Sequence, residues 1–316
     1  TNWLGPFLRQ SSLAERDTYL SLAALGSFDN KTAVYSLIHA ALFADITHWP
    51  AESRRLASLT LAWLTSCADR RIRDLSSKGL SRILANYPEN CQTVISEFAY
   101  CDDDYVLERI SLAIYSACLL SRQRRNAFMP ALPGLLSIAS DSENILLRDT
   151  VQLLVNLLKT GEFPTAVTSQ LQHYQTNVSL PSRWPVLADV KPLLDLEHLP
   201  SNMVLWGESM APDFWRYQVV SKISGFDLES ANISHENIAC WLMREALNLG
   251  YPGYNHCALN YDRHIGSQYG SGRGRKGDAD RLGKKYYWIA LHRLLGILAS
   301  NVPDRKSTRL NSSHIA

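Results

Sequence analysis

The sequence predicts a mainly α fold, in which an α-solenoid is followed by a smaller α+β region. Two observations lead to this prediction. Apolar residues recur at helical spacing, segment after segment, through roughly the first half of the chain. Beyond residue 200 the composition shifts toward aromatic and β-branched residues that alternate along the chain, which favours a strand.

The first half reads as a series of amphipathic helices. Each segment places its apolar residues on one side at the three- and four-residue spacing of a helix. Asp102 to Asp104 mark a helix start through capping and the helix dipole, and Gly161 followed by Pro164 marks a helix end. The segments are "SRRLASLTLAWLTSCA", "RIRDLSSKGLSRILANY", "DDDYVLERISLAIYSACLLS" and "SENILLRDTVQLLVNLLKTG".

A repeat underlies these helices, because Arg73, Arg109 and Arg148 each stand early in one of them, 36 and 39 residues apart. This pattern resembles HEAT repeats, in which a helical hairpin of about 40 residues recurs. The resemblance implies that an Asp and an Arg of the second helix join neighbouring repeats. The pairs would be Asp69 with Arg73 and Asp104 with Arg109, whereas the third copy has Asn144 in place of Asp. We therefore interpret these arginines as scaffold residues rather than ligand-binding residues.

The second half divides into three parts. Four prolines interrupt residues 166–200, which we interpret as a Pro-rich connection after the repeats of residues 1–165. In the α+β region, residues 201–303, the alternation in "FWRYQVVSKI" predicts a strand from Phe214. Ser234 is the expected N-cap of a helix that Gly250 ends, and a last helix is expected from about Lys285 to Ser300.

Charge and cysteine usage limit the classes of protein that fit. The formal charge of +2 comes from residues 304–316, where three basic residues face Asp304, so the rest of the chain has no net charge. The six cysteines are scattered and form no C-x-x-C pair, which favours a reduced, cytoplasmic compartment. No uncharged apolar run approaches the roughly 20 residues that span a bilayer, so we expect no membrane partner.

A glycine-rich basic loop is the most distinctive candidate site. Residues 263–285 hold seven Lys/Arg and two Asp, a net charge of +5. Backbone amides and guanidinium groups of such a loop could contact phosphate or nucleic acid, although a solvated surface loop is the competing interpretation. It is not a P-loop, because position 278 is Asp and Lys285 replaces the Ser/Thr. The candidate contacts are Arg263, Arg273, Arg275, Lys276, Arg281, Lys284 and Lys285.

Two other patterns point to chemistry only weakly. Three histidines and two cysteines lie between His235 and His264, but without the tight pairs that zinc sites use, so no metal site is predicted. "GESMA" lacks the last glycine of a nucleophile elbow, so Ser209 is not predicted to be catalytic. We expect no cofactor.

The stretch "DRLGKKYYWIALHRLLGILASNV", from Asp280 to Val302, resembles a segment of very large bacterial ATP-binding proteins of the antiviral STAND NTPase (Avs-like) type, and "GKKYYWIA" is its specific part. The resemblance implies an N-terminal effector, a central P-loop NTPase and a C-terminal helical-repeat sensor, of which this chain would be the last. No P-loop or Walker B residue stands in this chain, so no ATPase role passes to any position.

The last residues, "DRKSTRLNSSHIA", resemble a translated sequencing adapter over residues 304–314. Such a tail is excluded from fold reasoning. Since the chain also starts at Thr1, we expect a fragment of a longer bacterial protein from metagenomic DNA.

These observations together predict a non-catalytic scaffold or recognition segment that binds a protein partner through a helical-repeat surface. Two alternatives stay open: a module that contacts nucleic acid or phosphate through residues 263–285, and an enzyme domain in residues 201–303 that uses the same loop.

Overall fold

The computed structural model describes residues 4–159, 167–168, 171, 178–190, 214–252, 257–262 and 281–303. Helices account for most of these residues and no β-strand occurs among them, which confirms the mainly α prediction. None of the helices in these ranges combines the length and apolar character that a membrane crossing requires.

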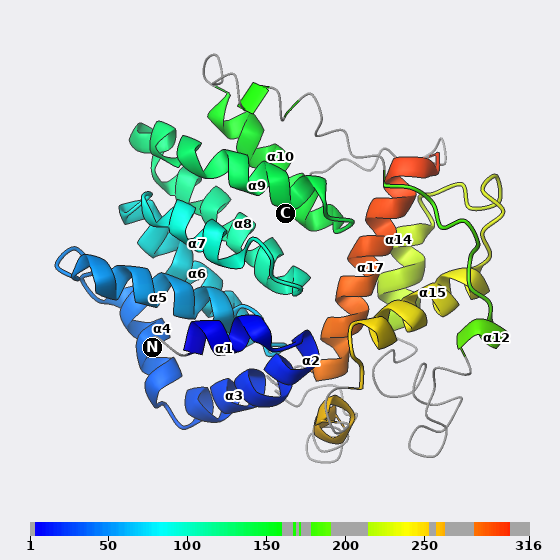
Figure 1. The fold of residues 1–316 in the computed structure, drawn as a ribbon, viewed down its shortest axis with the longest axis horizontal. Helices are drawn as coiled ribbons and strands as arrows, with labels where there is room; N and C mark the ends of the chain where they lie inside the picture. The colour runs from blue at the N-terminus through cyan, green and yellow to red at the C-terminus, as the bar shows by residue number, and fades with distance from the viewer. Residues whose placement is uncertain are drawn as a thin grey trace.

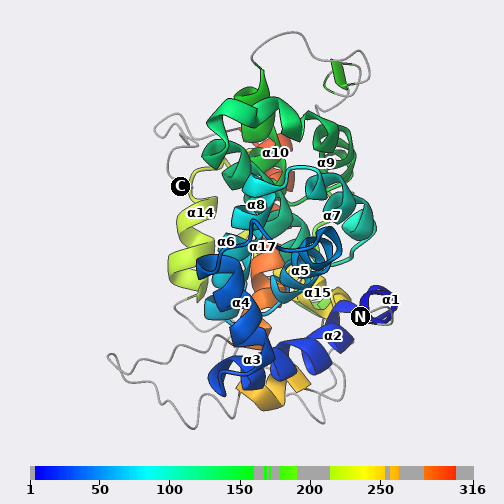
Figure 2. The same ribbon diagram turned by 90° about the vertical axis from the view of Figure 1, so that its left-hand side faces the viewer.

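From residue 33 to residue 158 the chain runs back and forth between two layers of helices (Figures 1 and 2). One layer contains α5 (Ala51–Leu64), α7 (Asn90–Phe98) and α9 (Leu132–Ser140). The 3₁₀ segment η2 (Arg122–Ala131) leads into α9. The other layer contains α4 (Ala33–Phe43), α6 (Arg70–Asn86), α8 (Asp104–Leu120) and α10 (Ile145–Leu158).

Three helices of the second layer, α6, α8 and α10, start in the same way. The side chains of Asp69, Asp103 and Asn144 each accept a hydrogen bond from the backbone N–H two residues later, and so cap α6, α8 and α10. The C-terminal ends of α6 and α8 are also neighbours, because Ser121 Oγ donates to the Ala85 carbonyl at 2.8 Å. These helices are therefore parallel to one another, with their N-terminal ends at one edge of the stack and their C-terminal ends at the other.

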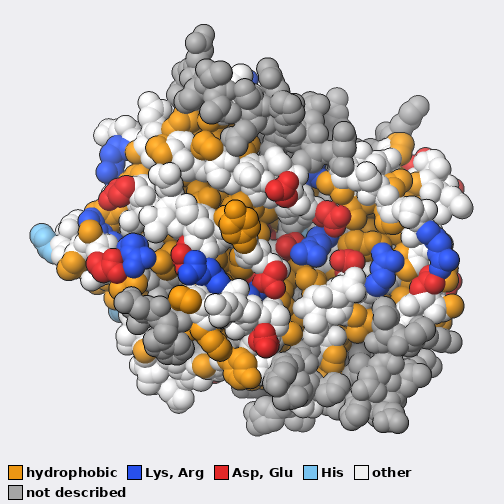
Figure 3. All heavy atoms as spheres, in the orientation of Figure 1, with side chains coloured by type: hydrophobic (Ala, Val, Ile, Leu, Met, Phe, Trp, Pro, Cys, Tyr) orange, Lys and Arg blue, Asp and Glu red, His pale blue; other side chains and the backbone are white. Residues whose placement is uncertain are grey.

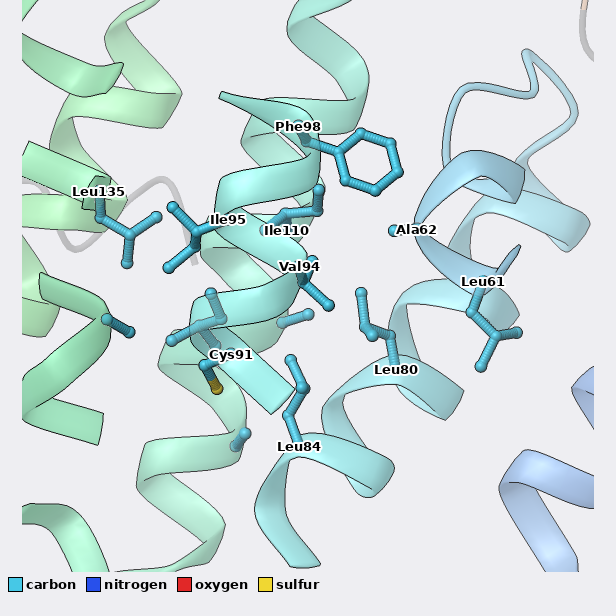
Figure 4. Close-up of a cluster of buried hydrophobic side chains, with 14 of the residues drawn as sticks. Leu61, Ala62, Leu80, Leu84, Cys91, Val94, Ile95, Phe98, Ile110 and Leu135 are labelled. Atoms are coloured by element: carbon cyan, nitrogen blue, oxygen red, sulfur yellow. The ribbon is translucent and has the colours of Figure 1, made fainter. Parts of the chain in front are cut away.

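The core of the stack lies between the two layers. Figure 4 shows side chains of α5, α6, α7, α8 and α9 converging there. Phe98 packs against Trp63 with ring centroids 4.6 Å apart. Most of the cluster is almost fully excluded from water, including Leu61, Leu80, Leu84, Cys91, Val94 and Ile110. Burial of apolar area at roughly 25 cal/mol per Å² is the main force that holds the layers together.

The N-terminal segment adds a bent helix at one end of the stack. It comprises α1 (Leu4–Gln10), α2 (Leu13–Arg16), the π-helical turn η1 (Asp17–Ser21) and α3 (Leu22–Asp29). Ser12 and Glu15 form a capping box at the start of α2. A π-helical turn inserts an extra residue into the helix, which alters the direction of the side chains within it.

The C-terminal part packs across one edge of the stack and has its own apolar core. It contains α12 (Leu187–Val190), the π-helical turn η5 (Trp215–Val220), α14 (Ser221–Ile223), α15 (His235–Asn248) and α17 (Leu282–Asn301). Figure 1 shows α17 running across the stacked helices, on the side where α8 and α10 begin. Its side chains are buried on nearly all sides, as expected of a helix that is apolar all round.

The strand prediction for "FWRYQVVSKI" is wrong, because residues 214–223 are helical. The buried residues are Phe214, Val219 and Ile223, five and then four positions apart, which suits a helix with a π turn and not a two-residue alternation. Phe214 packs edge-on against Trp288 of α17 at 5.1 Å, so tertiary contact outweighs the local preference of aromatic and β-branched residues for strands. Residues 201–213 lie outside the described part of the chain.

Candidate functional site: the charged seam beneath α17

Helix α17 presents polar side chains to the N-terminal ends of the stacked helices, although most of its residues are apolar. Lys285, His292 and Arg293 lie seven and eight residues apart, which places them on one face of the helix. They meet acidic side chains of η1 and α8. We call this group the charged seam: Asp17, Asp103, Asp104, Glu108, Lys285, His292 and Arg293.

The most buried part of the seam is a lysine between two carboxylates. Lys285 Nζ donates to Asp17 Oδ1 at 3.0 Å and to Asp103 Oδ2 at 2.6 Å, and all three side chains are excluded from water. The π turn holds Asp17, which Ser21 also contacts at 2.8 Å, and Asp103 is at the same time the N-cap of α8. One ammonium group thus joins the N-terminal segment, α8 and α17.

Burial and charge act in opposite directions in this group. Burial alone lowers the pKa of Lys285, but the carboxylates of Asp103 and Asp17 more than compensate, so its pKa is raised. Burial also raises the pKa of Asp17, against the attraction of Lys285. The hydroxyl of Tyr286 lies beside this group, and burial raises its pKa well above the ordinary value. The lysine therefore stays charged and the group acts as a structural ion cluster.

A second part of the seam joins four helices. Arg293 donates to both oxygens of Asp104, at 2.9 and 2.8 Å, in the two-point geometry that strengthens such pairs. The same arginine lies 3.8 Å from Glu245 of α15, and Asn144 Nδ2 at the start of α10 reaches Asp104 at 3.5 Å. Helices α8, α10 and α17 thus meet at the Asp104 carboxylate, and α15 joins them through Arg293.

The third part of the seam pairs two buried groups whose ordinary charges are suppressed. Glu108 Oε2 lies 3.8 Å from His292 Nδ1, and neither atom has a hydrogen-bond partner. Burial raises the pKa of Glu108 to about 7, while Arg109 and Arg73 oppose the shift. Burial lowers the pKa of His292 to about 3, assisted by the positive charges of Lys222 and Arg109. Both groups are therefore largely uncharged in mildly acidic solution.

Beyond the charges, α17 touches the stack through its backbone. A Cβ at Gly296 would lie 1.9 Å from the carbonyl oxygen of Glu143, just before α10, so only glycine fits at this crossing. One turn later Ser300 Oγ accepts from Arg148 of α10 at 3.3 Å. The helix therefore contacts the stack along most of its length, from Lys285 to Ser300.

The structure places the predicted repeat residues at this same edge but with other partners. The arginine that forks onto Asp69 is Arg71, at 3.1 and 2.9 Å. Arg109 of α8 reaches back to Asp74 of α6 at 3.2 Å, so an Asp–Arg pair does link neighbouring helices. Arg73 also contacts Asp74, at 3.3 Å. Asp104 is bound by Arg293 and Asn144, as described above.

The predicted phosphate contacts are dispersed or outside the described residues. Arg263, Arg273, Arg275 and Lys276 lie outside them. Arg281 and Lys284 are half-buried at the start of α17. The prediction for Lys285 is wrong, because its ammonium group is buried between two carboxylates and is not accessible to a ligand.

The start of α17 is itself occupied by an anion. Buried Asp262 accepts hydrogen bonds from the backbone N–H groups of Leu282 and Gly283 at 2.7 and 2.9 Å. The N-terminus of a helix is where a phosphate commonly binds. Here a carboxylate of the chain takes that position.

Sequence reasoning missed most of the seam. The residues predicted from the sequence do not include Asp17, Glu108, His292 or Arg293, and Lys285 is predicted there to contact phosphate or nucleic acid. A signal was present, because polar residues at seven- and eight-residue spacing in an apolar helix indicate a buried polar face. The sequence does not reveal the partners, since Lys285 and Asp17 lie 268 positions apart.

In the part of the chain that the structure describes, no group of three or more His, Cys, Asp or Glu side chains is placed to hold a metal ion. Comparison with known proteins adds no relative: no family model, no curated protein and no solved structure matches this chain.

Proposed function

We propose that this chain is a non-catalytic scaffold of HEAT-like helical repeats that binds a protein partner through the outer face of its second helix layer. The observation that carries the proposal is a difference between two sides of the stack. The charged seam and α17 brace the N-terminal ends of α8 and α10, and the outward faces of these helices keep exposed apolar side chains.

The exposed side chains on this face are of the kind that protein interfaces use. On α8, Leu112 and Tyr115 are half-buried and Leu119 is 40% exposed, at helical spacing. On α10, Leu153 is 44% exposed. Stacked hairpins characteristically present such extended faces to a protein partner.

The braced stack also suits a recognition role energetically. A buried ion cluster contributes little net stability compared with apolar packing. Removal of one member is nevertheless strongly destabilising, because the remaining charge is then buried without a partner. The seam therefore favours one arrangement of α17 against α8 and α10. A rigid surface loses less conformational entropy on binding, which improves affinity.

The alternatives have less support among the described residues. The seam is buried, and burial explains the shifted pKa values of Glu108 and His292. The loop that both alternatives require lies largely outside the described residues. The antiviral STAND NTPase (Avs-like) context and a cytoplasmic location stay part of the proposal, and buried, free Cys67, Cys91 and Cys118 agree with a reduced compartment.

The test is site-specific photo-crosslinking of the full chain in bacterial cells. A benzophenone amino acid at position 119 or 153 should give a discrete protein adduct that mass spectrometry identifies, and Leu153→Asp should abolish the adduct formed from position 119. The matched control is position 217, where Tyr217 is also exposed, at 56%, but lies on η5. Equal adducts from all three positions, or adducts that nuclease removes, would contradict the proposal.

A further inference from the structure

The opposite edge of the stack carries a group of five arginines. We call it the arginine edge: Arg54, Arg82, Arg122, Arg124 and Arg125. It is formed where α4, α6 and α8 end, and it faces the viewer in Figure 2, with α17 on the far side. In the part of the chain that the structure describes, none of these five side chains forms an ion pair with a carboxylate.

The contrast with the seam edge is clear. There, each basic side chain of the ion clusters has a carboxylate nearby, as for Arg71 with Asp29 at 3.1 Å and Arg293 with Asp104 at 2.8 Å. Figure 3 likewise shows acidic and basic side chains interspersed over the face it displays. The arginine edge instead concentrates positive charge, which attracts acidic ligands and increases the rate of their association.

Part of this charge serves the fold. Arg82 donates to the carbonyls of Ala41 and Ala44 at 2.8 Å each, and Arg124 donates to the carbonyl of Ala85 at 2.9 Å. These contacts satisfy carbonyl groups at the ends of α4 and α6, where cations are favourable. Arg54 lies over the ring of Tyr87, 3.7 Å from its centroid.

Only Arg82 and Arg124 are used to cap helix ends, and the other arginines of the edge are not needed for that purpose. Arg122 is exposed, and Arg125 Nε is buried without a hydrogen-bond partner. Because Arg82 and Arg124 are already held in place by carbonyl groups, a ligand that pairs with their free N–H groups loses less side-chain entropy. A set of partly fixed guanidinium groups matches the geometry of carboxylates.

Two hollows lie beside these arginines. The larger, of about 550 Å³, is lined by Arg82, Arg122 and Arg124 together with Asn86, Leu120 and Ser121. The smaller, of about 320 Å³, is lined by Arg124 together with Pro88, Glu89, Gln92 and Pro130. Arg124 borders both hollows, and Leu120 beside the larger one is 70% exposed.

We propose that the arginine edge binds an extended acidic peptide segment of the protein partner. Carboxylates of the segment pair with Arg122 and Arg124 in the larger hollow, and an apolar residue next to them packs on Leu120. Separate hollows, an exposed leucine and the acidic Glu89 at the rim suit a peptide better than a continuous polyphosphate strand. The inference rests on the proposed protein-binding function and names the chemistry of the partner.

The experiment uses the full chain and a fluorescent peptide of about ten residues, rich in Glu with two Leu. Fluorescence anisotropy should show binding that weakens as salt rises, because screening reduces exposed charge pairs. Arg122→Gln should weaken the affinity by about tenfold or more, the loss expected for a hydrogen bond to a charged group. Arg122 caps no helix, so its replacement leaves the fold intact, which circular dichroism would check.

Arg55→Gln is the matched control, because Arg55 is also a partly exposed helix arginine but pairs with Glu52 at 2.7 Å. Its affinity should equal that of the wild type. No binding at low salt, or equal losses in both variants, would overturn the proposal. Tighter, Arg122-dependent binding of a single-stranded oligonucleotide of the same charge would replace the peptide with nucleic acid.

The crosslinking test separates this inference from the proposed function. Adducts at positions 119 and 153 without peptide binding would contradict only the proposal that the arginine edge binds an acidic peptide. If neither the adducts nor peptide binding were observed, the proposed protein-binding function itself would be contradicted.

Discussion

Replacing Gly296 by alanine tests whether α17 braces the stack in the way the structure indicates. A Cβ at this position would lie 1.9 Å from the carbonyl oxygen of Glu143, whereas ordinary contacts begin at 3.4 Å. The obstacle is backbone rather than a flexible side chain, so α17 or the start of α10 must move by about 1.5 Å.

The expected free-energy change follows from three effects. Alanine is favoured over glycine inside a helix by about 1 kcal/mol. Overpacking costs about 1–3 kcal/mol. Movement of Glu143 also disturbs the neighbouring cap, in which Asn144 accepts from the amides of Leu146 and Leu147, worth about 1 kcal/mol. The net expectation is a destabilisation of about 1–3 kcal/mol, which is the difference between these losses and the gain.

Gly26→Ala is the matched control, because Gly26 also lies in a helix and a Cβ there would meet nothing within 4 Å. This variant should be stabilised by about 0.5–1 kcal/mol. Urea unfolding followed by circular dichroism measures both changes, and hydrogen exchange should show reduced protection of the amides of Leu146 and Leu147 only in Gly296→Ala. A Gly296→Ala variant as stable as the wild type would refute the contact between α17 and the start of α10.

The remaining predictions concern the charged seam. Lys285→Met should destabilise the fold by about 3–5 kcal/mol at neutral pH, since it leaves Asp17 and Asp103 buried without their cation. Adding Asp17→Asn and Asp103→Asn should restore much of that loss in urea titrations; a further decrease would contradict the ion-cluster interpretation. The pKa of Glu108 is raised to about 7, so the contribution of this group to stability is present at low pH and is lost as pH rises above about 4.5. The pKa of His292 is lowered to about 3, so the contribution of His292 to stability is lost as pH falls below about 6.5. The two effects oppose each other between pH 4.5 and 6.5. There Glu108→Gln should make the free energy of unfolding rise with pH relative to the wild type, and His292→Gln should make it fall, by up to about 1.4 kcal/mol per pH unit. Stability–pH curves parallel to that of the wild type would rule out these shifts.

Local sequence patterns were sufficient for most helices of the first half and for their start signals. The apolar spacing in residues 104–120 and 145–158 corresponds to α8 and α10, and Ser234 caps α15 as expected. Such features depend on residues within one or two turns of each other, so the sequence contains the information directly. The mainly α class follows from them.

The segment from Phe214 to Ile223 shows where local pattern is not enough. Its residues suit a strand by type and alternation, yet the apolar surface offered by Tyr287 and Trp288 of α17 is buried best by a helix with a π turn. Strand preference depends on what the side chains pack against, and that partner is distant in the sequence.

By itself, therefore, the sequence determined where helices occur in the first half, how they begin and that arginines recur 36 and 39 residues apart. Only the tertiary structure decided what those polar positions contact. Lys285 belongs by sequence to a basic run, but folding places it 2.6 Å from Asp103, which is 182 positions away. Arg82 and Arg124 become part of a basic edge because the ends of α4, α6 and α8 meet there. The energy of a charge depends on burial and on nearby charges, and both arise from long-range packing that no local pattern records.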